Sequence, residues 1–166
     1  MNKKIMLIGL YILLNTSYLV AAIQPNPIGD PINQKDSSNR KQGFWSYTEQ
    51  RQHYEVYYKN DTLNGSYKAY YQNKVLAGIG TYYKGREIGI WYSFNEIGRL
   101  YLEVSKIKYT TRKINQKEAY VKTYYDNGNC KEEGYAKYDD IEIDYEKIGV
   151  WKKYNKNGGI FDTTED

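Results

Sequence analysis

Short runs of alternating aromatic and polar residues, separated by turns rich in glycine and asparagine, fill the chain from Gly43 to Asp166. Tyr, Trp, Val, Ile and Thr dominate these runs, whereas Leu and Ala together number only eight. Such runs suit pleated strands, because successive side chains point to opposite faces of a sheet and broad rings pack well there. The pattern predicts a body that is all β.

The runs form an internal repeat. Each unit opens on a glycine-x-aromatic triplet or a variant of it: Gly43-Phe-Trp45, Gly65-Ser-Tyr67, Gly89-Ile-Trp91, Ala119-Tyr-Val121 and Gly149-Val-Trp151, at offsets of 22, 24, 30 and 30 residues. A turn such as Asn127-Gly128 follows, and a second strand returns to the next unit. Because both residues of an Asn-Gly turn tolerate positive φ, we expect type I′ hairpins there. Self-similarity at this period predicts a stacked array of hairpins.

The unit resembles the MORN repeat, in particular its bacterial variant, which reads approximately G-x-W-x-x-Y-Y-x-N-G-x-L-x-x-E-G-x-Y-x-x-G-x-x-x-G-x-W. The segment from Asn73 to Trp91 fits this pattern without a gap, with Lys74 in place of the turn glycine and Ile79 in place of the glutamate. In other units the glutamate position holds Glu55, Glu103 and Glu133. The resemblance covers about residues 43–160. It implies an elongated single-layer antiparallel β-meander of about five MORN-like hairpin repeats.

The repeat predicts structural positions of two kinds, namely glycines at turns and close contacts and aromatic rings that pack the sheet. A thin sheet has no thick aliphatic core, so we expect its rings to bury their bodies while their polar atoms reach water. These positions are Gly43, Trp45, Gly65, Tyr67, Gly80, Tyr82, Gly85, Gly89, Trp91, Gly128, Gly134, Gly149, Trp151 and Gly158.

Several units carry two tyrosines in succession, and in a strand these must point to opposite faces. One member of each pair is therefore predicted to lie on the outer face, where contiguous aromatic surface would serve binding. The candidate binding surface consists of Tyr58, Tyr71, Tyr83 and Tyr125.

The N-terminus reads as a secretory signal peptide over residues 1–22. Lys3 and Lys4 precede an apolar run, and Ala21-Ala22 offers a cleavage site after Ala22. A transmembrane anchor is the alternative, but the run is shorter than the roughly 20 apolar residues that a span needs. We therefore predict a secreted or periplasmic protein with an extended linker or N-terminal arm over residues 23–42, which holds all three prolines, and a repeat domain over residues 43–166.

Composition argues against catalysis. The chain has 24 Lys and Arg, 20 Asp and Glu, but only one histidine, His53, and one cysteine, Cys130. These two residues cannot supply a zinc cluster or a disulfide framework, and no catalytic motif surrounds them. We predict no catalytic residue, no metal site and no cofactor. The near balance of charge also gives no reason to bind nucleic acid.

Two charged stretches fall in the longer third and fourth units. Lys106 and Lys108 lie in one, and an acidic run from Asp139 to Glu146 lies in the other. We expect the two stretches to lie side by side, with these lysines facing the acidic run. Exposed pairs of this kind contribute at most roughly 1 kcal/mol each.

Together these features predict an exported, non-catalytic binding module for an unidentified protein or an envelope glycan. Two alternatives stay open. The resemblance suggests an antitoxin or immunity-like component, because bacterial proteins with this repeat variant are often labelled antitoxins, and MORN repeats elsewhere are linked to phospholipid binding, which suggests peripheral membrane or cell-wall association. Open sheet edges also make self-association a candidate interaction.

Overall fold

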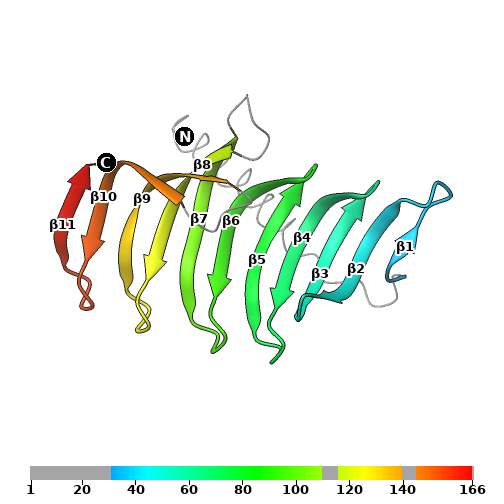
Figure 1. Cartoon of the computed structure of the whole chain (residues 1–166), viewed down its shortest axis with the longest axis horizontal. Helices are drawn as coiled ribbons and strands as arrows, with labels where there is room; N and C mark the ends of the chain where they lie inside the picture. The colour runs from blue at the N-terminus through cyan, green and yellow to red at the C-terminus, as the bar shows by residue number, and fades with distance from the viewer. Residues whose placement is uncertain (1–30, 110–115, 140–144, 166) are drawn as a thin grey trace, which may run out of the picture.

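The computed structural model describes residues 31–109, 116–139 and 145–165, which form one antiparallel sheet of eleven strands (Figure 1). Strands that are neighbours in the sequence are neighbours in the sheet, so the prediction of a single-layer β-meander is confirmed. The predicted signal peptide lies outside the described residues. The strands are β1 (Gln34–Lys35), β2 (Lys41–Glu49), β3 (Gln52–Lys59), β4 (Thr62–Tyr70), β5 (Leu76–Tyr83), β6 (Arg86–Phe94), β7 (Leu100–Tyr109), β8 (Gln116–Tyr124), β9 (Cys130–Asp139), β10 (Tyr145–Tyr154) and β11 (Ile160–Glu165).

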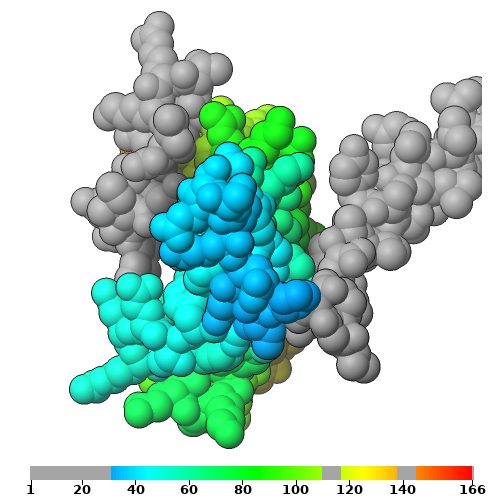
Figure 2. Space-filling model, turned by 90° about the vertical axis from the view of Figure 1, so that its right-hand side faces the viewer, coloured from blue at the N-terminus to red at the C-terminus, as the bar shows by residue number. Residues whose placement is uncertain are grey.

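The five predicted units correspond to five hairpins, β2–β3, β4–β5, β6–β7, β8–β9 and β10–β11. The sheet begins earlier than the repeat, because β1 pairs with the start of β2 inside the range predicted as an arm. Seen from the β1 end, β1 and β2 form the front of a narrow slab (Figure 2). The N-terminal residues that the structure describes are therefore part of the sheet.

Two kinds of turn join the strands, and the Asn-Gly turns differ from the type I′ expectation. Asn60-Asp61 is a two-residue turn in which both residues have positive φ, 51° and 63°, as type I′ requires. At the Asn-Gly turn Gly128 has φ 86°, whereas Asn127 does not have positive φ. There the Gly128 N–H donates to the Tyr125 carbonyl at 2.9 Å, and the Asn129 N–H donates to the Asn127 side chain at 3.1 Å. The asparagine side chain thus stabilises a longer loop with a single left-handed residue.

The two faces of the sheet have different chemistry. We call one side of the sheet the tryptophan face. One row of residues on this side crosses the strands, either in register or through a β-bulge, and it contains Trp45, Val56, Tyr67, Trp91 and Trp151. The opposite side carries three repeated glutamates, and we call it the glutamate face. Its members include Glu55, Lys68, Glu103, Lys122 and Glu133, which occupy a single row.

On the tryptophan face, each of two indole rings lies directly on a glycine of the preceding strand. A methyl group built on Gly80 would overlap the ring of Trp91, and one built on Gly134 would lie 2.5 Å from Trp151 Cδ2. The strands bulge at these tryptophans, and Gly89 and Gly149 accommodate the bulges with φ of 73° and 65°. Glycine opposite tryptophan is therefore a packing requirement of the unit.

Where a tyrosine or a valine replaces the tryptophan, a valine replaces the glycine of the preceding strand. Val56 pairs with Tyr67, and Val104 pairs with Val121, at the positions where the other units have glycine and tryptophan. Val56, Val104 and Val121 are buried. Large and small residues therefore compensate each other between neighbouring strands, as close packing demands.

The C-terminal half of the tryptophan face holds the most closed part of the core. Trp151 is 0% exposed, packs with Val121 and Ala136, and donates its indole N–H to the Tyr135 carbonyl at 2.7 Å. The start of β10 bends across the upper end of the sheet in Figure 1. This bend brings the ring of Tyr145 parallel to that of Trp151, with centroids 5.8 Å apart.

The glutamate face carries a repeated hydrogen bond between a glutamate and a tyrosine of the next strand. Tyr70 donates to Glu55 at 3.1 Å, Tyr124 to Glu103 at 3.0 Å and Tyr154 to Glu133 at 2.6 Å. The second unit has Ile79 in the glutamate position, and its register places Phe94 where the other units have the tyrosine. The two departures from the repeat therefore compensate each other, because Phe has no hydroxyl that needs the carboxylate.

These contacts shift the acidity of the tyrosines. The Glu133 carboxylate, and after it burial, raises the pKa of Tyr154 to about 12, while burial and then the charge of Glu55 raise the pKa of Tyr70 to about 12. Burial opposes ionisation of Glu133, but hydrogen bonds from Tyr154 and the charge of Lys122 outweigh it and lower the pKa of Glu133. The face is therefore held together by neutral hydroxyls and ionised carboxylates.

We predict that Gly80→Ala destabilises the protein by about 2 kcal/mol, because the added methyl forces the Trp91 ring out of its place. The matched control is Gly78→Ala, whose methyl would meet only the Tyr92 carbonyl at 3.7 Å, so its stability should stay near that of the wild type. Urea unfolding measures both. Equal midpoints for the two variants would contradict the stacking of glycine and tryptophan.

We also predict a loss of stability in alkali. The unfolded tyrosines ionise near pH 10, whereas Tyr70 and Tyr154 ionise at about 12 when folded. Their contribution is therefore complete below pH 10 and is lost as the pH rises from about 10 to 12. Parallel titrations of tyrosinate absorbance and circular dichroism test this, with Tyr154→Phe expected to weaken the pH dependence. Full ionisation near pH 10 without unfolding would be inconsistent with these contacts.

Candidate functional site

The two residues with the most reactive side chains lie in ordinary surroundings. The ring nitrogens of His53 lie 3.3 Å from the Ser46 hydroxyl and 3.4 Å from the Thr48 hydroxyl, on the glutamate face. Cys130 begins β9, and burial raises the pKa of its thiol, which makes it less reactive. Within residues 31–109, 116–139 and 145–165, no group of three or more His, Cys, Asp or Glu is placed to hold a metal ion.

The tryptophan face between β2 and β6 carries a contiguous group of seven aromatic rings, which we call the aromatic cluster. Neighbouring rings pack against one another. The ring centroids of Tyr47 and Tyr54 are 5.4 Å apart, those of Tyr54 and Tyr67 are 6.2 Å apart, and those of Tyr67 and Tyr82 are 5.6 Å apart. Each of the seven side chains is half-buried. The members are Trp45, Tyr47, Tyr54, Tyr58, Tyr67, Tyr82 and Trp91.

Two hydroxyls of the cluster, those of Tyr47 and Tyr67, are harder to ionise than that of a free tyrosine. Burial, and then a hydrogen bond with Tyr58, raises the pKa of Tyr47 to about 12, and burial also raises the pKa of Tyr67. A neutral phenol offers both a donor and an acceptor beside an apolar ring. This surface therefore suits ligands that combine apolar faces with hydrogen-bonding groups.

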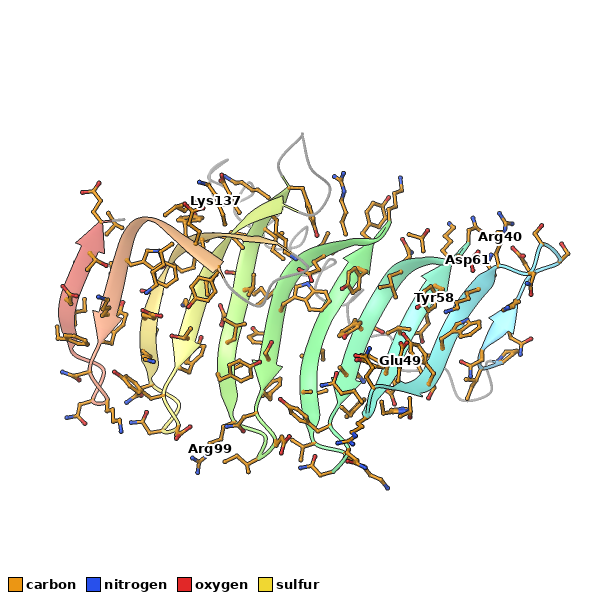
Figure 3. The ribbon with its side chains drawn as sticks, in the orientation of Figure 1. Arg40, Glu49, Tyr58, Asp61, Arg99 and Lys137 are labelled. Carbon is orange, nitrogen blue, oxygen red and sulfur yellow. The ribbon has the colours of Figure 1, made fainter. Side chains whose placement is uncertain are left out.

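A lysine ammonium lies at the end of the cluster nearest β1. The Lys41 Nζ lies 4.7 Å from the ring centroid of Tyr58, 4.8 Å from that of Trp45 and 5.8 Å from that of Tyr47. Asp61 fixes the lysine backbone, because its carboxylate accepts the Lys41 N–H at 2.8 Å. Figure 3 shows Tyr58 and Asp61 in this region of the sheet.

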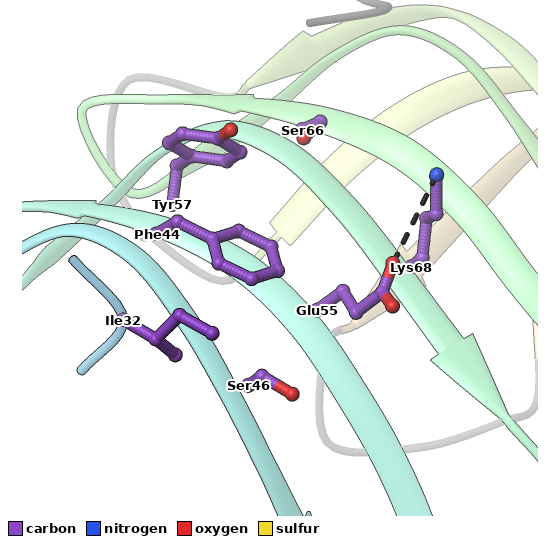
Figure 4. A pocket seen from close by; sticks show the side chains of 7 residues that line it. All are labelled: Ile32, Phe44, Ser46, Glu55, Tyr57, Ser66 and Lys68. Carbon is purple, nitrogen blue, oxygen red and sulfur yellow. Dashed lines mark ion pairs between the residues drawn. The ribbon is translucent and has the colours of Figure 1, made fainter. Parts of the chain in front are cut away.

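A small hollow lies on the opposite, glutamate face of the same strands (Figure 4). Its volume is about 280 Å³, and the Glu55 carboxylate and the Lys68 ammonium at its wall are 3.9 Å apart. The hollow is lined by Ile32, Phe44, Ser46, Glu55, Tyr57, Ser66 and Lys68. Its two charged groups, Glu55 and Lys68, are paired with each other, although at a long distance.

The four tyrosines predicted as a binding surface do not lie together. Tyr58 belongs to the aromatic cluster, whereas Tyr83 is 53% exposed and follows Tyr82, so it points to the other face. Tyr71 and Tyr125 lie in turns, and their hydroxyls donate to the carbonyls of Phe94 and Tyr154, each at 2.8 Å. The turn tyrosines therefore fasten one hairpin turn to the next.

Tyr47 and Tyr54 of the aromatic cluster, and Lys41 beside it, were not singled out from the sequence. The signal for the tyrosines was present, because Tyr47 and Tyr54 flank the first turn of the repeat domain at positions that pair across a hairpin. Lys41 lies before the predicted domain boundary, and nothing in the repeat marks it.

The predicted pairing of Lys106 and Lys108 with the acidic run is wrong among the described residues. Lys106 occupies a bulge with φ 52°, and its ammonium lies 4.6 Å from the ring centroid of Tyr120. Lys108 pairs in register with Glu118, and Glu146 forms its ion pair with Lys137 at 3.8 Å. The reason is topological, because β8 and β9 separate β7 from β10. Residues 140–144 of the run lie outside the described residues.

The two edges of the sheet are covered differently. At β2 the side chain of Asn33 donates to the Ser46 carbonyl at 3.0 Å and accepts the Ser46 N–H at 2.9 Å, as a neighbouring strand would. At the other edge β11 pairs with β10 and exposes Ile160 and Phe161. Self-association stays a prediction, and β11 is the edge at which we expect it.

No protein-family model, curated protein or solved structure matches the chain. The MORN resemblance therefore stays a prediction from the repeat pattern. In the described part of the chain, no helix has the length and apolar character needed to cross a membrane.

Proposed function

We propose that the protein is an exported, non-catalytic binding module of MORN-like hairpin repeats, and that the aromatic cluster docks an envelope glycan or a protein. The observation that carries this proposal is an asymmetry between equivalent positions of the repeat. Trp151 is 0% exposed, whereas Trp45 and Trp91 are only half-buried. If the rings served only to pack the sheet, they would be fully buried in every unit.

The chemistry of the cluster supports the same proposal. Tyrosine and tryptophan are enriched where proteins bind one another, because each ring offers a large apolar area with few rotatable bonds. Five of the rings are in contact from Tyr47 to Trp91, and the pair of Trp45 and Tyr58 lies beside them, so the cluster extends across five strands. The antitoxin or immunity-like alternative depends on the resemblance alone.

A photocrosslinking experiment in the native envelope tests which face binds. A photoreactive phenylalanine derivative replaces Tyr82 in the aromatic cluster or, as a matched control, Tyr92, which is also half-buried but lies on the glutamate face. We expect crosslinked products from position 82 and few from position 92. Products from position 92 alone would contradict the proposal that the aromatic cluster is the docking surface.

A further inference from the structure

The three rings around Lys41 form a cage for a cation. Trp45 and Tyr58 meet edge to face, with centroids 5.8 Å apart and an interplanar angle of 78°. Together with Tyr47 they place three electron-rich faces within about 6 Å of one ammonium nitrogen, the range over which cation–π attraction operates. The cage therefore has the geometry of a site for a positively charged group.

The walls of the cage are fixed without help from the lysine ammonium. Trp45 pairs in register with Val56, and its indole N–H donates to the Gln42 carbonyl at 3.1 Å. Tyr58 pairs with Gly43 on the neighbouring strand. The rings are thus held by the sheet, so the cage should keep its shape when the lysine side chain leaves.

The lysine itself is held only weakly. Among the described residues no carboxylate forms an ion pair with the Lys41 ammonium, and its contacts are the three rings. By contrast, Lys147 lies 4.5 Å from the Trp151 ring and also contacts the Glu132 carboxylate at 2.6 Å. Lys147 therefore belongs to a closed structural contact, whereas the flexible stem of Lys41 can swing into water.

We propose that the cage binds a quaternary ammonium group and that Lys41 occupies it in the absence of ligand. A primary ammonium is strongly hydrated, whereas a trimethylammonium group is larger, less hydrated and apolar at its surface. It therefore fills the space between the rings at a lower desolvation cost than the lysine does. This inference rests on the proposed function, because it names a ligand class for one end of the aromatic cluster.

The test is a titration with tetramethylammonium chloride, followed by the indole N–H signal of Trp45 in heteronuclear NMR spectra. Lys41→Met removes the internal competitor and should tighten binding about tenfold, the effect of removing one desolvated cation–π contact. Lys147→Met is the matched control and should leave the affinity unchanged. Sodium chloride at the same concentration corrects for ionic strength.

The cage walls are tested in the Lys41→Met background. Tyr58→Leu and, separately, Trp45→Leu should each abolish binding, with the backbone amide signal of Tyr47 followed in the second variant and circular dichroism used to confirm folding. Equal affinity in Lys41→Met and in either folded wall variant would overturn the proposal, as would the absence of binding to Lys41→Met. If tetramethylammonium fails while position 82 still yields crosslinks, the cage proposal fails and the binding module stands.

Two further probes identify the source of the group. Binding of soluble phosphocholine would assign the site to a free or glycan-linked headgroup. Cosedimentation with phosphatidylcholine vesicles, but not with phosphatidylglycerol vesicles, would assign it to a lipid surface when soluble phosphocholine does not bind. Either result supports a quaternary ammonium site, and loss of both interactions in the Tyr58→Leu variant is required.

Discussion

The absence of a second layer in the described sheet is the constraint on which the rest of its structure depends. Each strand must cover its apolar face with side chains from its neighbours, since no helix or opposing sheet lies within the described chain. The repeat meets this constraint by placing an indole over a glycine, as with Trp91 on Gly80 and Trp151 on Gly134. Where the indole is missing, Val104 and Val121 fill the space from both strands.

The same constraint separates the two faces by chemistry. On the glutamate face, carboxylates and phenols bond across strands, and the loss of one partner at Ile79 is matched by the loss of the hydroxyl at Phe94. On the tryptophan face, the C-terminal half closes over Trp151, while the N-terminal half leaves its rings only partly buried. The N-terminal units therefore leave a row of only partly buried rings, and this is the surface that we propose for binding.

Much of the fold could be predicted from the sequence because the repeat carries local information. Each triplet, such as Gly89-Ile-Trp91, opened one unit, and each unit became one hairpin as expected. The bulge at this triplet was not predicted. The Asn-Gly turns were predicted less well, since the side chain of Asn127 stabilises a longer loop than the dipeptide alone indicates. The local sequence determines where the strands form, whereas side-chain hydrogen bonds determine the conformation of these turns.

The candidate site was harder to predict, because its contacts depend on register and not on motif. Tyr58 and Lys41 are 17 positions apart and meet only because β2 and β3 pair with Gly43 opposite Tyr58. The prediction of an outward tyrosine in each doublet placed Tyr71 and Tyr125 on a surface, but their hydroxyls bond to the next turn. The alternation of side chains between the two faces of a strand does not predict such a hydrogen bond between turns.

The position of the glycine α-protons in the NMR spectrum tests the central claim most directly. Protons that lie beneath an indole ring are shifted upfield by its ring current. The packing of indole on glycine predicts strong upfield shifts for Gly80 and Gly134, with ordinary values for Gly78, which has no ring above it. Ordinary shifts at Gly80 and Gly134 in the folded protein would contradict the account.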